Sequence, residues 1–134
     1  MSWIAIALLL ATLVMLAIHL TSWKLVQAWY GAPGSWVLRR LGPMCVLRME
    51  AAYWALALAA WPLWWSSWLK VVVPACAAIH LAGWGAGEFH RSRVEARPAE
   101  ERTRQRLVTA VTLFDFVESI VLLAVAWFAA RQIL

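Results

Sequence analysis

The chain has 134 residues, 64% of them hydrophobic and only 14% charged, and its mean hydropathy is +0.71. This composition is unlike that of an ordinary soluble domain. The net charge of +5 does not indicate nucleic acid binding, because the basic residues lie in linkers between long apolar runs, where they set topology and contact anionic headgroups. We therefore expect membrane lipids as partners and no nucleic acid partner.

The apolar runs are about twenty residues long, which is the length that crosses roughly 30 Å of hydrocarbon as a helix. They predict an all-α integral membrane protein, a four-helix bundle in which residues 1–134 form a single transmembrane domain. The first run has no basic segment before it and no clear cleavage site after it, so we expect it to be retained as a helix. The expected spans are about 3–22, 51–69, 71–87 and 107–130.

The first linker is expected to carry a short helix of its own. The first helix could continue to Tyr30, before Gly31-Ala32-Pro33-Gly34 interrupts the chain. From Trp36 to Leu41 the mixture of Trp, Val, Leu and Arg predicts a short helix lying along the membrane interface. Gly42-Pro43 then ends this stretch and allows a new helix to begin at Pro43.

The second and third spans are expected to pack together as antiparallel neighbours, since only the short stretch 66–70 connects them. Pro62 should kink the last turn of the second span. In the third span Gly83 and Gly87 form a small-residue ladder that would let a neighbouring backbone approach closely.

The third linker, 88–106, is strongly charged. Pro98 followed by two acidic residues predicts a helix start there, and we expect this helix to run without a break into the fourth span as a cytoplasmic extension.

Lys and Arg residues predict the orientation. Four of the twelve lie in linker 23–50 and six in linker 88–106, and only Lys70 and Arg131 fall on the other side. The positive-inside rule therefore places both linkers in the cytoplasm and both termini outside, in a multi-pass protein of the cell membrane, expected to be a bacterial inner membrane. The chain is rich in tryptophan, and these residues should form aromatic belts at both boundaries. The outer belt would contain Trp3, Trp61, Trp64, Trp65, Trp68 and Trp127, and the inner belt Trp23, Trp29, Trp36 and Trp84.

Ionisable side chains in hydrocarbon are costly, so each one near a span is a candidate site. Asp115 lies about eight residues, or roughly 12 Å, inside the fourth span, too deep for its short side chain to reach headgroups. Glu118 is its neighbour one turn on, so both intramembrane carboxylates should face the other helices. The expected site is a polar cluster in the cytoplasmic half of the bundle, for protons or a ligand. Its members would be Asp115, Glu118, His80, His19, Arg48 and Glu50.

Two roles remain open for several of these residues. The two acids could carry protons or bind a cation, or they could be a structural hydrogen-bond cluster that sets the helix register. Arg48 could be an anchor at the interface, or it could reach inward as the counter-ion of Asp115 or Glu118.

Cofactor motifs are weak. We expect no cofactor, although His19 and His80 on different helices raise the possibility of haem b held by two imidazoles. Their depths differ by several ångströms if the first helix ends near Leu20, which weakens that interpretation, and this difference shrinks if the helix continues to Tyr30. No metal site is expected, because the acids and histidines lack ExxH or HxxxH spacing. The two cysteines, Cys45 and Cys76, lack metal-ligand spacing and are expected to be small buried residues.

No catalytic motif is complete, so the sequence favours a non-enzymatic protein, and catalytic residues stay unknown. The first hypothesis is an accessory subunit or a small binding or transport module, acting as a homo-oligomer or as a subunit of a larger membrane complex. The alternatives are a haem- or quinone-binding membrane anchor of a redox complex, and a membrane enzyme that acts on a lipid or isoprenoid with an intramembrane carboxylic acid.

Overall fold

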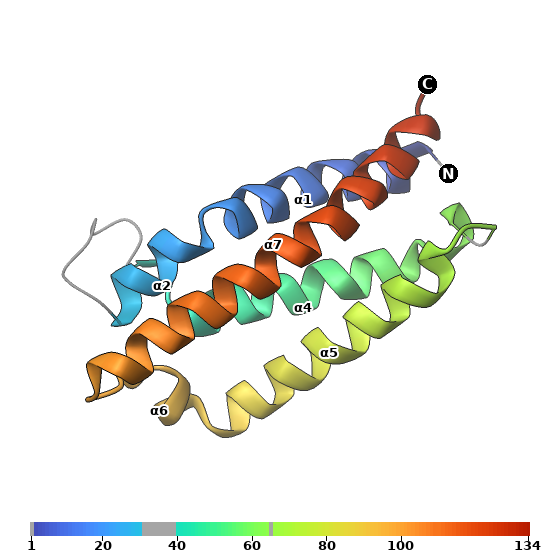
Figure 1. The fold of residues 1–134 in the computed structure, drawn as a ribbon. Helices are drawn as coiled ribbons and strands as arrows, with labels where there is room; N and C mark the ends of the chain where they lie inside the picture. Colours follow the sequence, from blue (N-terminus) through green and yellow to red (C-terminus); the bar gives the residue numbers. More distant parts are fainter. Residues whose placement is uncertain (1, 31–39, 65) are drawn as a thin grey trace.

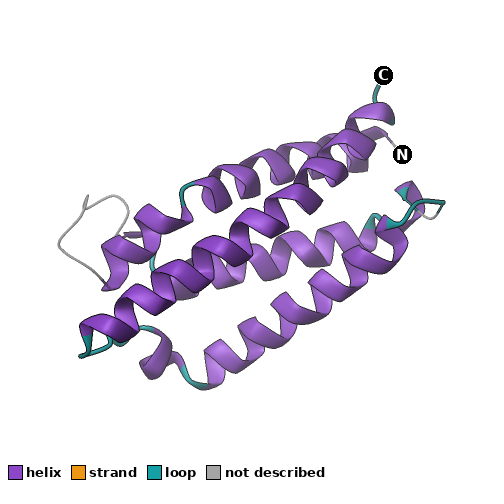
Figure 2. Ribbon diagram, in the orientation of Figure 1, coloured by secondary structure: helices purple, strands orange, loops and turns teal. Residues whose placement is uncertain are grey.

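The computed structural model describes residues 2–30, 40–64 and 66–134, and within these ranges the chain is helical and contains no strand (Figure 2). The all-α prediction is therefore confirmed for the described residues. The long helices run lengthwise beside one another (Figure 1): they are α1 (Ser2–Leu20), α4 (Pro43–Ala59), α5 (Leu69–Phe89) and α7 (Glu101–Arg131). The shorter elements are α2 (Ser22–Tyr30), the 3₁₀ turn η1 (Trp61–Leu63) and α6 (Arg91–Val94). The interfacial helix expected at residues 36–41 lies largely outside the described residues.

Three of the described helices are long and apolar enough to cross a membrane. They are Trp3–Leu20, Leu69–Phe89 and Glu101–Arg131, and an 18-residue stretch of each has a mean hydropathy of 2.5, 1.4 and 2.0, respectively. Their positions agree with the first, third and fourth expected spans. The last helix has 31 residues and is about 46 Å long, so it exceeds the hydrocarbon thickness and carries its charged first turns beyond it.

The second expected span differs, because residues 51–69 do not form one helix. As predicted, α4 begins at Pro43, whose fixed φ suits the first turn of a helix, but it ends at Ala59 after 17 residues. The expected kink at Pro62 is instead a helix end. Proline disfavours helical geometry in the residue before it and lacks an N–H, so the chain passes through η1 before α5 begins at Leu69.

The long helices pack as two pairs, α1 against α7 and α4 against α5, and α1 also contacts α4. The antiparallel pairing across residues 66–70 is thus confirmed (Figure 1). Only one glycine of the expected ladder serves a close approach. A Cβ on Gly87 would lie 3.1 Å from Leu47 Cδ1, whereas one on Gly83 would meet nothing within 4 Å.

The two ends of the molecule differ in polarity. The start of α1, the end of α7 and η1 lie at one end, and α2, the start of α4 and α6 lie at the other (Figure 1). The buried apolar core gathers toward the first end, with Leu8, Trp54, Trp64 and Leu122 fully buried. Trp64 was expected in an aromatic belt and is instead part of this core.

Candidate functional site

His19 is held in the last turn of α1, directly before Thr21 separates α1 from α2. Its Nδ1 lies 2.9 Å from the carbonyl oxygen of Met15, one helical turn back, and its Nε2 lies 2.8 Å from Glu118 Oε2 on α7. The side chain is fully buried. A buried polar ring needs partners for both nitrogens, and His19 has them.

Two acids of α7 point toward the other helices, as their depth in the sequence predicted. Glu118 is 4% exposed and Asp115 is 6% exposed. Asp115 Oδ1 lies 4.0 Å from His19 Nε2. Among the described residues, Glu118 Oε1 has no hydrogen-bond partner, so one oxygen of a buried carboxyl group is left over.

His80 reaches the same carboxyl group from α5. Its Nε2 lies 3.3 Å from Glu118 Oε2, and its Nδ1 lies 2.8 Å from the carbonyl oxygen of Cys76. The ring stacks on Trp54, with 5.5 Å between ring centroids and an interplanar angle of 30°. His19, His80, Asp115 and Glu118 therefore form one group from three helices, which we call the acid–histidine cluster.

The two histidines lie at the same level, because both Nε2 atoms contact one carboxylate oxygen. This agrees with the case in which the first helix continues to Tyr30, and the depth difference expected for a helix that ends near Leu20 is absent. The first helix continues as α2 after a single-residue break at Thr21, where the hydroxyl bonds to the carbonyl of Ala17. His19 therefore lies within the nearly continuous helical stretch formed by α1 and α2, and not at its end.

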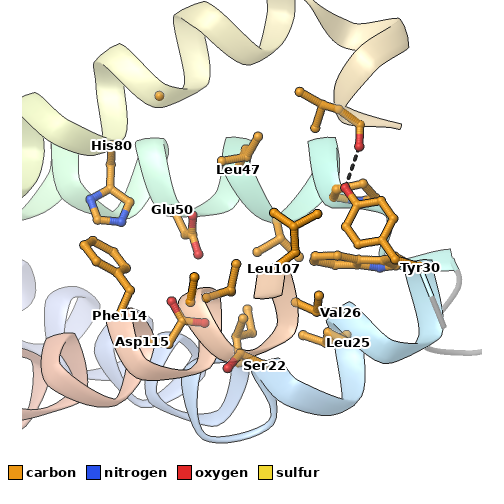
Figure 3. Close-up of a pocket in the computed structure, with 18 of the residues that line it drawn as sticks. Ser22, Leu25, Val26, Tyr30, Leu47, Glu50, His80, Leu107, Phe114 and Asp115 are labelled. Atoms are coloured by element: carbon orange, nitrogen blue, oxygen red, sulfur yellow. Dashed lines mark hydrogen bonds between the residues drawn. The ribbon is translucent and has the colours of Figure 1, made fainter. Parts of the chain in front are cut away.

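A cavity of about 540 Å³ adjoins the cluster. Its walls come from α2, α4, α5 and α7, with single contributions from α1 and α6, and most of them are apolar side chains (Figure 3). The polar lining includes Glu50, His80 and Asp115, which point into the same end of the space (Figure 3). Glu50 is half-buried and comes from α4, so a third carboxyl group faces this end of the cavity.

The opposite end of the cavity is bounded by α2 and α6. Tyr30 donates its hydroxyl hydrogen to the carbonyl oxygen of Val94 over 2.5 Å (Figure 3). Burial, with a smaller contribution from the negative charge of Glu95, raises the pKa of Tyr30 above its ordinary value. Tyr30 therefore ties α2 to α6 as a neutral hydrogen-bond donor.

Arg48 does not join the cluster, so the hypothesis of an inward counter-ion is wrong. Its guanidinium binds Glu88 through Nε to Oε1 at 2.6 Å and through Nη2 to Oε2 at 3.1 Å. Trp84 also donates to this carboxylate at 3.0 Å. Arg48 is exposed because it lies on another face of α4 than Leu47 and Glu50, which line the cavity, and this face is turned toward Glu88 of α5. The structure thus gathers five of the six predicted site residues around the cluster and the cavity.

Sequence reasoning missed several features of this site. Trp54, which stacks on His80, carried no signal beyond its apolar surroundings. The ligand-type atoms of His19, Asp115 and Glu118 all lie within 4.8 Å of one another, although their spacing along the chain matches no metal motif. Neither cysteine thiol belongs to the site, and both cysteines were expected to be buried, whereas Cys45 is exposed and Cys76 is half-buried.

The geometry suits the binding of positive charge. The ion pairs of Asp115 and Glu118 within the described residues are with histidines, which are cationic only when protonated. A group of buried carboxyl groups without a fixed cation must therefore hold protons or another cation. No family model, no curated protein and no solved structure matches this chain.

Proposed function

We propose that this chain is a multi-pass membrane protein, built as a four-helix bundle, that serves as a small binding or transport module, alone or as an accessory subunit. Its site is the cavity with the acid–histidine cluster at one end. The cavity carries this proposal, because an apolar chamber of about 540 Å³ with a few converging polar groups is the usual form of a small-molecule site.

The membrane setting rests on three helices of sufficient length and apolarity, with α4 and η1 completing the bundle as a fourth, shorter crossing. Large apolar side chains remain exposed around the helices, among them Trp3, Phe116 and Trp127, and lipid would cover them. With ten of the twelve basic residues in linkers 23–50 and 88–106, the cavity lies in the cytoplasmic half and both termini lie outside.

The ligand is an elongated apolar molecule with a polar or cationic head. The apolar walls between α5 and α7 would hold its body, and Glu50, His80 and Asp115 would receive its head. Because the carboxyl groups bind either protons or the head group, binding at this end exchanges the ligand against protons.

Gly83 offers a direct test. It lines the cavity and a Cβ there would meet nothing within 4 Å, so Gly83→Leu places a side chain in the cavity from a position where the first added atom is free. Gly85 has equal freedom on the same helix but does not line the cavity, which makes Gly85→Leu the matched control. The three proteins are purified in a mild detergent, and native mass spectrometry measures the small molecules that remain bound.

We expect one class of apolar molecule to remain bound to the wild type and to Gly85→Leu and to be lost from Gly83→Leu. Acidification should release it from the wild type, and the triple variant Glu50→Gln, Asp115→Asn, Glu118→Gln should lose this pH dependence. Equal occupancy in all three proteins, or none in any, would contradict the proposal.

A quinone-binding subunit of a redox complex is the second candidate, because protonated carboxyl groups at the end of an apolar cavity can donate hydrogen bonds to quinone carbonyl oxygens. The mass of the bound molecule separates this candidate from a lipid carrier. Haem is less favoured. Its iron would have to lie between the two histidine Nε2 atoms, and Glu118 Oε2 already occupies that position.

A further inference from the structure

The two histidines of the cluster share one tautomer. His19 Nδ1 faces the carbonyl oxygen of Met15, and His80 Nδ1 faces that of Cys76. A carbonyl oxygen only accepts, so each Nδ1 carries the hydrogen, and in a neutral ring each Nε2 carries a lone pair. This is the arrangement of histidines that bind metal ions, in which the second ring nitrogen donates to a backbone carbonyl or a carboxylate.

The lone pairs of the two histidine Nε2 atoms point at carboxylate oxygens, which are also hydrogen-bond acceptors. Both Nε2 atoms face Glu118 Oε2, and Asp115 Oδ1 lies 4.0 Å from the Nε2 of His19. Lone pairs facing one another repel unless positive charge lies between them, so the cluster must hold a proton or a metal ion. Glu118 Oε1 is a second indication of a bound cation. This oxygen belongs to a side chain that is 96% buried, and it has no hydrogen-bond partner among the described residues.

The spacing of these atoms fits a metal ion. Zinc bound tetrahedrally by nitrogen and oxygen at about 2.0–2.2 Å holds its ligand atoms about 3.4 Å apart. The contacts of the cluster, at 2.8, 3.3 and 4.0 Å, lie on both sides of that value. Of these three contacts only the one between His19 and Glu118 must open, by about half an ångström, when a metal replaces the shared proton. The ligand atoms of His19, Asp115 and Glu118 all lie within 4.8 Å of one another, and His80 reaches this group through its contact with Glu118.

We propose that His19, Asp115 and Glu118 bind one divalent first-row transition metal ion and that His80, which contacts Glu118, moves toward the ion as the fourth ligand. Zn²⁺ is the best match to two imidazoles and two carboxylates. The inference rests on the proposed function in placing the ion at the same end of the cavity. His80 and Asp115 also line the cavity, so the ion would face the head of the bound molecule. Metal binding would displace the protons of the cluster, and affinity should fall as the pH falls.

The test uses Co²⁺ alone as the probe. Metal-stripped protein, purified with a tag that contains no histidine, is titrated with CoCl₂ in detergent while visible d–d absorption is recorded. We expect one equivalent of Co²⁺ to give the absorption of a low-coordinate site, and Zn²⁺ to remove it. His19→Gln and Glu118→Gln should each weaken binding by more than the roughly 10–100-fold typical of changes to the outer partners of a metal ligand.

His90→Gln and Arg48→Gln are the matched controls, because both residues lie outside the cluster and should leave the titration unchanged. Circular dichroism of each variant verifies that it is folded. Folded wild-type protein without d–d absorption overturns the metal site, as does equal Co²⁺ affinity in wild type and cluster variants.

The metal site and the proposed function can fail separately. If Co²⁺ does not bind but Gly83→Leu still removes the apolar molecule, the metal inference alone is wrong. If Co²⁺ binds and Gly83→Leu changes no bound molecule, the metal site is supported and the proposed ligand cavity is wrong.

Discussion

His19 Nε2 and Glu118 Oε2 lie 2.8 Å apart although 99 residues separate them along the chain. This contact joins α1 to α7, and His80 adds α5 at the same carboxylate oxygen. Three helices therefore share one buried polar centre, and the stability of that centre depends on the group at position 118.

Glu118→Gln should leave the fold intact, because an amide nitrogen has two hydrogens and the two histidine Nε2 atoms can accept them. Glu118→Ala leaves those buried nitrogens without a partner and should lower the free energy of unfolding by about 1–3 kcal/mol. Reversible unfolding in mixed micelles measures both variants. Equal stability of the two would show that the histidines do not depend on this side chain.

Trp54 is fully buried, and its Nε1 has no hydrogen-bond partner among the described residues. Trp54→Ala should lower the free energy of unfolding by about 3–5 kcal/mol, since it leaves a large cavity beside His80. Trp54→Phe keeps an aromatic ring against the imidazole and removes the unpaired N–H, so it should cost clearly less. Thermal unfolding in detergent compares the two, and a phenylalanine variant as unstable as the alanine variant would contradict the expectation.

Gly87 marks the closest approach between α4 and α5. Because a Cβ there would lie 3.1 Å from Leu47 Cδ1 and 3.4 Å from Met44 Sδ, Gly87→Leu should overpack this contact and cost about 1–3 kcal/mol. Gly85→Leu is the control, since a Cβ at Gly85 meets nothing within 4 Å. Thermal unfolding should separate the two variants by several degrees, and identical transitions would show that α4 and α5 tolerate a wider spacing.

Tyr30 provides a pH prediction outside the spans. Its pKa is raised above the ordinary value of about 10 by burial and by Glu95, so the folded state holds its proton more tightly than the unfolded chain does. The stabilisation by the bond to Val94 is therefore fully present below about pH 10 and is lost as the pH rises through the folded-state pKa.

Ultraviolet titration of tyrosinate measures this pKa. The difference between wild type and Tyr30→Phe isolates Tyr30 from the other tyrosine, Tyr53, and its midpoint should lie above about pH 10. A midpoint at or below that value would mean that Tyr30 is solvated rather than held against α6.

The sequence by itself determined the helical class, three apolar spans and the inward direction of Asp115 and Glu118. These properties depend on near neighbours in the chain, because helical hydrogen bonds join residues four apart and the hydrophobicity of a run sums over adjacent side chains. The continuation of the charged linker into α7 was predictable for the same reason.

Only the tertiary structure decided which polar groups meet. The rotation and offset of packed helices determine that Glu118 contacts both histidines and that Arg48 binds Glu88. They also determine that Arg48 lies on another face of α4 than Glu50, which lines the cavity. Apolar residues all favour burial alike, so their pattern does not specify these offsets. The same packing decided that Trp64 is core and that Gly83 borders a cavity.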